Sequence, residues 1–156
     1  MLKISPCLWF DNQAEEAVNF YVSIFKNGKI GKTLHYGEGA PFPAGTILTI
    51  TFEIDGVSFT ALNGGPHFKF NEAVSFVVDC KSQEEVDYYW NRLLEGGIEQ
   101  QCGWLKDKFG VSWQIVPDAV SRLINDPDSG RAARVMQALM KMVKIDIATL
   151  EKAANG

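Results

Sequence analysis

Asp55-Gly56-Val57-Ser58-Phe59 recurs later in the chain as Phe109-Gly110-Val111-Ser112-Trp113, and this repeated phrase decides the fold. A second repeated pair lies upstream, where Asp11 to Gly28 can be aligned with Asp79 to Gly96. Both pairs occur in the same order along the chain, so they indicate a duplicated unit of a strand, a helix and further strands. Two copies are too few for a solenoid, and we therefore expect them to form two halves of one body.

The size and composition of the chain define its broad class. It has 156 residues, of which 46% are hydrophobic, enough to bury a substantial core. The formal net charge is −4, and no basic cluster interleaved with aromatic residues occurs, which argues against a nucleic-acid partner. We found no run of about 18 apolar residues and no apolar leader, so the sequence predicts neither a membrane span nor a signal peptide.

The cysteine pattern indicates the compartment. Cys7, Cys80 and Cys102 are odd in number and show no Cys-x-x-Cys spacing. This pattern is typical of reduced thiols, not of a disulfide framework or a zinc cage. We therefore expect a cytoplasmic protein.

The first copy contains one helix and four strands. Its helix is marked by apolar residues at helical spacing, with Asp11 and Asn12 as candidate N-caps. Asp55-Gly56 between alternating apolar residues predicts a two-residue hairpin turn. The expected elements are a strand over 3–10, a helix over 13–26, and strands over 29–36, 45–54 and 57–63.

The second copy repeats this order after the connector Asn63-Gly64-Gly65-Pro66. Ser82 is the expected N-cap of its helix, and Glu85 completes a capping box. Pro117 is expected to end its sheet. The expected strands are 73–79 before the helix and 98–101, 103–107 and 111–116 after it.

Residues after Pro117 lie outside the repeat and are predicted to form helices. We expect a helix over 118–124, a turn over 126–130, a helix over 131–143 and a last helix capped by Asp146. The apolar face of the long helix has two interpretations. Its methionines could form a pliable recognition groove, or the helices could pack on their own sheet or on a partner subunit.

These elements predict an α+β fold of two βαβββ modules, over about 3–64 and 72–117, which form one domain over 1–117. A helical extension covers 118–156. A curved four-stranded sheet under one helix leaves a concave face to cover. Two such sheets would enclose a pocket between them, so we expect the modules to pair, within one chain or between chains.

The duplicated βαβββ order and the segment Asp107-Lys108-Phe109-Gly110-Val111-Ser112-Trp113-Gln114 resemble the vicinal-oxygen-chelate superfamily, which includes glyoxalase I, extradiol dioxygenases and bleomycin-resistance proteins. Within it, the chain looks most like the PhnB-like branch, whose members often carry the name 3-demethylubiquinone-9 3-methyltransferase. Asn63-Gly64-Gly65-Pro66 and Trp113-Gln114-Ile115-Val116-Pro117 are the more specific parts. A fold does not fix an activity.

The resemblance also implies where a metal would bind. Metal-dependent members place ligands on the first and last strand of each module. On the last strands these positions correspond to Thr60 and Gln114, and on the first strands to residues near 4–6 and 72–74. Ile4, Thr60 and Gln114 thus replace three of the implied ligands, and only Glu72 could still serve as one. A first-row metal needs several converging imidazoles or carboxylates. We therefore expect no metal and no other cofactor.

The candidate ligand-binding residues follow from the same mapping. Cys102 would need a base to become a catalytic thiol, and otherwise fills a strand. His67 is either a solvated linker residue or an acid–base group near the pocket, and His35 is expected at the surface. Strand alternation places Gln114 and Trp113 on opposite faces, so Trp113 should pack under a helix. The full candidate set is Thr60, Asn63, His67, Glu72, Cys102, Trp104 and Gln114.

The function that these observations favour is metal-independent binding of a small molecule by a homodimer. An enzyme of the lyase, isomerase or dioxygenase type with altered metal ligands is the alternative. A third possibility is an interaction module whose C-terminal helices bind another protein. Methyl transfer, implied by the branch name, is disfavoured because Gly64-Gly65-Pro66 lacks the G-x-G spacing of a nucleotide-type cofactor site.

Overall fold

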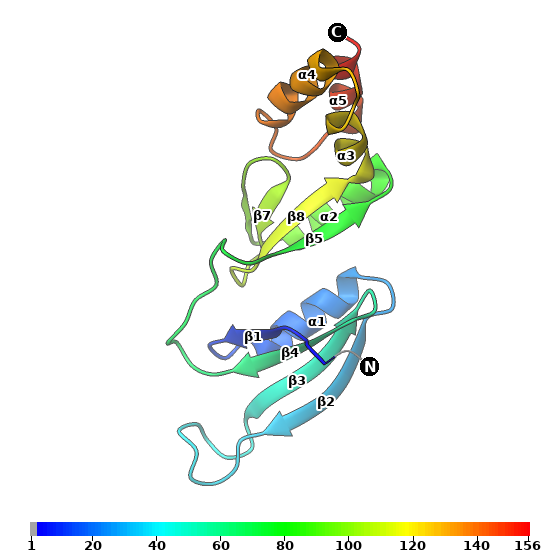
Figure 1. Cartoon of the computed structure of the whole chain (residues 1–156). Coiled ribbons are helices and arrows are strands. Elements are labelled where there is room, and N and C mark those ends of the chain that lie inside the picture. Colours follow the sequence, from blue (N-terminus) through cyan, green and yellow to red (C-terminus); the bar gives the residue numbers. More distant parts are fainter. Residues whose placement is uncertain (1–2) are drawn as a thin grey trace. The chain divides into compact units, whose positions relative to one another are not determined.

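The computed structural model describes residues 3–156. The chain divides into two compact units, Met1–Phe70 and Asn71–Gly156, and the boundary lies after the connector Asn63-Gly64-Gly65-Pro66, between the two expected modules. Each unit has its own four-stranded sheet (Figure 1). No helix within the described residues is both long and apolar enough to cross a membrane.

The first unit contains one mixed sheet and one helix. Its strands lie in the order β1-β4-β3-β2, with β1 parallel to β4 and the other neighbours antiparallel. The first strand is shorter than predicted because residues 3–6 are largely exposed, and only the Pro6 carbonyl is tied to the sheet, by the Thr60 N–H. The elements are β1 (Cys7–Phe10), α1 (Ala14–Ile24), β2 (Lys29–His35), β3 (Ile47–Ile54) and β4 (Val57–Asn63).

The second unit repeats this topology. Its strands lie in the order β5-β8-β7-β6, again with the first strand parallel to the last. The predicted duplication of a βαβββ module and the α+β class are therefore confirmed. The elements are β5 (Ser75–Cys80), α2 (Gln83–Leu94), β6 (Ile98–Glu99), β7 (Trp104–Lys106) and β8 (Ser112–Pro117).

The two Gly-Val-Ser segments occupy equivalent hairpins. Gly56 turns the chain between β3 and β4 with φ 77°, and Gly110 lies in the turn between β7 and β8 with φ 93°. These left-handed values favour glycine at both turns. The second turn is longer, and the buried Asp107 carboxylate closes it by accepting hydrogen bonds from the N–H groups of Phe109 and Val111.

Each sheet packs one face against its own helix. Tyr21 of α1 stacks on Phe52 with ring centroids 6.1 Å apart. In the second unit the Trp113 indole is buried and donates a 2.9 Å hydrogen bond to Asp107. The prediction that Trp113 faces the interior is confirmed. Buried residues on these faces include Leu8, Phe10, Ile50, Phe59 and Ala61 in the first sheet and Cys80, Leu105 and Ile115 in the second.

The helix caps were predicted for one helix and missed for the other. Ser82 caps α2, as expected, because its hydroxyl accepts from the Glu85 N–H at 3.2 Å. The prediction of Asp11 or Asn12 as caps of α1 was wrong. Asn63 performs this role from β4, accepting from the Ala14 N–H at 2.9 Å. Since Asn63 pairs with Phe10 in the sheet register, it lies beside the start of α1.

The C-terminal helices α3 (Asp118–Ile124), α4 (Ser129–Leu139) and α5 (Ile147–Ala154) gather at one end of the second unit (Figure 1). Their shared core includes the fully buried Val135, Ile145 and Leu150. The N-cap Asp146 is confirmed, since its carboxylate accepts from the Thr149 N–H.

The long helix was predicted over 131–143 but begins earlier and ends earlier. It begins at Ser129 because Asp128 accepts from the N–H groups of Gly130 and Arg131. It ends at Leu139, beyond which the carbonyls of Met142 and Val143 accept from the N–H groups of Cys102 and Gly103.

The tail therefore contacts its own unit. The Gln83 side chain on α2 holds it at two points, donating to the Ile145 carbonyl at 3.1 Å and accepting from the Ile147 N–H at 2.8 Å. Lys144 adds an ion pair with Asp87 of the same helix, at 2.7 Å. Of the two interpretations of the apolar face, packing on the chain's own unit is the one observed.

Candidate functional site

Three of the candidate site residues, Thr60, Trp104 and Gln114, lie on the face of a sheet that turns away from its helix, here called its open face. On the first sheet, Thr60 of β4 lies between Cys7 of β1 and Thr51 of β3 in the strand register. Directly paired residues of neighbouring strands share a face. The row Cys7–Thr60–Thr51 is therefore a continuous, partly exposed strip across the first open face.

The second open face has an equivalent row. Gln114 of β8 lies between Val77 of β5 and Trp104 of β7. Its amide nitrogen donates to the Ser75 hydroxyl at 2.9 Å, which orients the side chain along the sheet. Gln114 and Trp104 are half-buried, and Val77 is 54% exposed. The structure thus brings two of the predicted residues, Trp104 and Gln114, onto one face.

Glu72 extends over the same face from the segment before β5. One carboxylate oxygen lies 3.1 Å from the Lys106 ammonium, and the other accepts a 3.0 Å hydrogen bond from the Gln100 amide. The hydrogen bond from Lys106, followed by that from Gln100, lowers the pKa of Glu72 below its ordinary value. Glu72 is therefore ionised at neutral pH. Its carboxylate joins Lys106 of β7 and Gln100, which follows β6, into one polar cluster.

The residues at the positions where the resemblance implies metal ligands do not fit a transition metal. The strand register places Cys7 beside Thr60 and Val77 beside Gln114, whereas Ile4 is 87% exposed. One thiol, one hydroxyl, one amide and the Glu72 carboxylate, which is paired with Lys106, are not the set of converging imidazoles and carboxylates that such an ion needs. Among residues 3–156, no group of three or more histidine, cysteine, aspartate or glutamate side chains is arranged to hold a metal.

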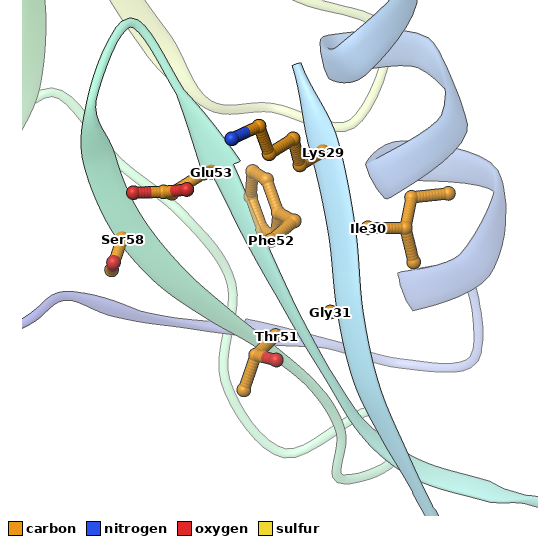
Figure 2. Close-up of a pocket in the computed structure, with 7 residues that line it drawn as sticks. All are labelled: Lys29, Ile30, Gly31, Thr51, Phe52, Glu53 and Ser58. Carbon is orange, nitrogen blue, oxygen red and sulfur yellow. The ribbon is translucent and has the colours of Figure 1, made fainter. Parts of the chain in front are cut away.

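A shallow hollow of about 280 Å³ lies at the β2 side of the first open face (Figure 2). Lys29, Glu53 and Ser58 extend into it, while Ile30 points away from them. Gly31 and Thr51 lie close together in its lining, and a Cβ at Gly31 would collide with the threonine hydroxyl. Sequence reasoning missed this feature, although a glycine inside a strand is a signal of close backbone approach.

Asn63 has a demanding structural role. Besides capping α1, its amide nitrogen donates to the Ile47 carbonyl at 3.2 Å, and its own carbonyl accepts from the Tyr36 hydroxyl at 2.5 Å. The neighbouring Gly64 packs against Trp9, whose indole donates to the Gly65 carbonyl at 2.9 Å. The glycine pair therefore serves the first unit's own packing.

The two histidines and Cys102 lie apart from these rows. His35 is exposed at the end of β2, as predicted, and His67 is exposed in the connector. Cys102 lies in the turn before β7, where its sulfur faces the Leu139 carbonyl at 3.6 Å. The tail helices, not a histidine, are its neighbours, so the structure brings no base to this thiol within the described residues.

The other two thiols differ in accessibility. Burial raises the pKa of Cys80 to about 12 and removes it from reactive chemistry at neutral pH. Cys7 is exposed at the start of β1, and partial desolvation raises its pKa as well. Neither side chain is an activated nucleophile.

Comparison with known proteins agrees with this geometry. A putative 3-demethylubiquinone-9 3-methyltransferase, the PhnB protein of Bacillus cereus, is 34% identical, with a TM-score of 0.68 over 74% of this chain and 99% of that one. A Pseudomonas aeruginosa protein shares the fold at 24% identity, with a TM-score of 0.63 over 75% of this chain and 98% of that one.

The fold also extends to an antibiotic-resistance protein. FosX from Listeria monocytogenes, a genomically encoded fosfomycin resistance protein solved with Mn(II) and sulfate, is 17% identical, with a TM-score of 0.54 over 74% of this chain and 92% of that one. A search among curated proteins found no match. The sequence profile of the 3-demethylubiquinone-9 3-methyltransferase family matches residues 2–116. The chain therefore belongs to this family, in agreement with its 34% identity to the PhnB protein.

Proposed function

We propose that this protein binds a small organic molecule on its open faces without using a metal ion. The observation that carries the proposal is the pair of equivalent rows, Cys7–Thr60–Thr51 and Val77–Gln114–Trp104. In these rows Thr60 and Gln114, at positions where the resemblance implies metal ligands, carry neutral side chains. Such rows offer hydrogen bonds and apolar contact in place of coordination.

The second open face has the mixed character of a ligand site. Ligand sites combine apolar surface with a small number of oriented polar groups. Trp104 and Val77 provide the apolar surface, while Gln114 is held in one orientation by Ser75. An aromatic ring beside fixed amide groups favours an organic ligand over a bare ion.

Two enzymatic alternatives have less support. A lyase, isomerase or dioxygenase of this superfamily would need a substitute set of metal ligands, and the described residues do not bring one together. Methyl transfer from a nucleotide-type cofactor would need a glycine-rich turn that is free to hold it. Gly64 instead packs on Trp9, and the Gly65 carbonyl accepts a hydrogen bond from the Trp9 indole.

The proposal includes a homodimer in the cytoplasm. The outer strand β2 exposes Ile30 and Leu34, which are 50% and 46% accessible, so it offers apolar surface for a second copy. Three unpaired cysteines suit a reducing compartment. Light scattering should give a mass about twice that of the 17.3 kDa chain, and a monomer at micromolar concentration would contradict the dimer.

Native mass spectrometry against a broad metabolite library tests ligand binding, and elemental analysis of protein purified without chelators tests the metal. We expect at least one organic binder and no stoichiometric transition metal. Substituting Gln114→Ala or Trp104→Leu should weaken the binder found. Glu84→Gln, on the exposed side of α2, removes a charge far from the open face and should leave binding unchanged.

The two measurements separate the candidate functions. A stoichiometric metal would favour the enzyme with altered ligands. The absence of any binder across the library would contradict the proposal itself.

A further inference from the structure

The Glu72 bridge crosses the second sheet. Glu72 precedes β5, which forms one edge of the sheet, whereas Lys106 belongs to β7 and Gln100 follows β6 on the far side of β8. Ser112 of β8 lies in the intervening row, paired with Ser75 on one side and with Lys106 on the other. The carboxylate thus reaches across the strand that carries Ser112.

Two polar atoms in this region have no partner. The Ser112 hydroxyl is buried, with the residue 1% exposed, and forms no hydrogen bond with any described residue. The carbonyl oxygen of the Gln100 side chain is also buried and unpaired within residues 3–156. Folded proteins leave few such atoms unsatisfied, because burial without a hydrogen bond destabilises the native state. Among described residues these are the only two side-chain atoms of this kind.

We propose that the Glu72 carboxylate occupies a position that the carboxylate of a ligand takes when it binds. The ligand carboxylate displaces Glu72 and binds Lys106 and Gln100 in its place. This inference rests on the proposed function and names the class of ligand. The ligand carries a carboxylate, a neighbouring aromatic or apolar body, and a hydroxyl or amino group. The carboxylate receives hydrogen bonds from Lys106, from the Gln100 amide nitrogen and from Ser112. The donor group satisfies the free oxygen of Gln100.

The adjoining row suits the body of such a ligand. Val77, Gln114 and Trp104 lie next to the Ser75–Ser112–Lys106 row along the same strands. A ring attached to the carboxylate by one or two carbons would lie over this row and contact Trp104. Charged hydrogen bonds at one end and stacking at the other would fix its orientation.

The bridge is weak enough to be displaced. The Glu72 side chain is 49% exposed and that of Lys106 25%, so water screens their attraction. Glu72 also lies outside the strands, in a segment whose described side-chain contacts are the Asn71 hydrogen bond to the Ala73 N–H and the bridge itself. Exchanging one carboxylate for another conserves the charge balance at Lys106, so the displacement leaves no buried charge unpaired.

Titration of the full chain with phenylacetate and its neutral isostere phenylacetamide, followed by NMR, tests the inference. The Glu72→Gln variant replaces the carboxylate that competes with the ligand by a neutral amide. We therefore expect phenylacetate to bind this variant about tenfold more tightly than it binds the unmodified protein. Phenylacetamide should bind both proteins equally weakly. The Gln100 side-chain amide resonance should shift only with phenylacetate.

Three variants make the test specific. Glu99→Gln removes an equal charge from the other face of the sheet, where Glu99 pairs with the buried Leu105, and should not change the affinity for phenylacetate. Lys106→Met combined with Glu72→Gln keeps the stem of the lysine and should abolish the gain. Ser112→Ala should weaken phenylacetate binding severalfold without lowering the stability of the free protein, because the hydroxyl has no partner to lose.

The outcomes separate this inference from the proposed function. Equal phenylacetate affinity with and without the Glu72 charge, or equal affinity for the amide and the acid, would overturn the displacement. Binders in the metabolite library that all lack a carboxylate would also overturn it while leaving small-molecule binding intact. A library without any binder would remove the proposed function.

Discussion

The two modules have the same backbone topology and different open faces. In both, the first strand pairs in parallel with the last, and a positive-φ glycine turns the final hairpin. The first open face presents Cys7, Thr60 and Thr51, whereas the second presents Val77, Gln114 and Trp104. Duplication thus preserved the residues that direct the chain, and the side chains on the open faces diverged.

The modules also stabilise equivalent places by different means. Asn63 ends β4 and caps α1, but the equivalent position at the end of β8 is Pro117, which has no side-chain donor or acceptor. The second helix is instead capped by its own Ser82. The second hairpin is longer than the first and depends on the buried Asp107 carboxylate. Substitutions at these positions test how far the equivalence extends.

The largest difference is expected between the two hairpin aspartates. Asp107→Asn should destabilise the protein by about 3 kcal/mol, because one amide oxygen cannot accept from Trp113, Phe109 and Val111 together. Asp55→Asn should cost less than about 0.5 kcal/mol, since asparagine tolerates the left-handed backbone there. Urea unfolding followed by tryptophan fluorescence measures both. Similar losses for the two variants would contradict a special role for Asp107.

The helix caps should differ by a smaller amount. Asn63→Ala removes the α1 cap and the hydrogen bond to Ile47, and we expect a loss of about 2 kcal/mol. Ser82→Ala removes one exposed cap bond and should cost about 1 kcal/mol. The same unfolding measurement applies. A larger loss for Ser82→Ala would mean that the cap supplied by β4 adds little.

Acid should weaken the attachment of the tail in the second module. The Lys144 ammonium, and then Gln83, lower the pKa of Asp87. Because the folded pKa is lowered, this contact stabilises the protein above the ordinary aspartate pKa of about 3.9 and is lost as pH falls through the folded value. Both side chains are partly exposed, so the effect is at most about 0.5 kcal/mol.

Asp87→Asn provides the matched control, since it introduces the residue that the first module carries at the equivalent Asn19. Hydrogen exchange of the tail amides between pH 5 and pH 3, corrected for intrinsic rates, should accelerate in the unmodified chain more than in this variant. An identical pH response in both proteins would rule out Asp87 as the acid-sensitive group.

The accessibility of Cys7 in β1 and Cys80 in β5 compares the first strands of the two modules without a substitution that changes protein stability. Iodoacetamide should modify Cys7 at the exposed start of β1 and leave Cys80 at the buried end of β5 intact, because burial raises the Cys80 pKa to about 12. Intact mass and peptide mapping under native conditions measure this. Modification of Cys80 at the rate of Cys7 would mean that the second sheet opens readily.

Much of the fold was predictable because its signals are local. The Asp-Gly turn, the helical spacing of apolar residues and the Ser82 cap each involve residues within a few positions of one another. The α1 cap was missed because Asn63 lies 49 positions from Ala14. For the candidate site, strand alternation predicted that Gln114 and Trp113 point to opposite faces of the sheet. The hollow beside Gly31 was not predictable in this way, because it depends on where β3 lies beside β2.

The sequence by itself determined two copies of one βαβββ module and a helical tail, because turns, caps and periodicity act over short distances. The tertiary structure alone decided which side chains became neighbours: Asn63 with α1, Gln83 with the tail, and Glu72 with Lys106 and Gln100. These contacts join residues far apart in the chain, and they form only when strand pairing sets the register between segments.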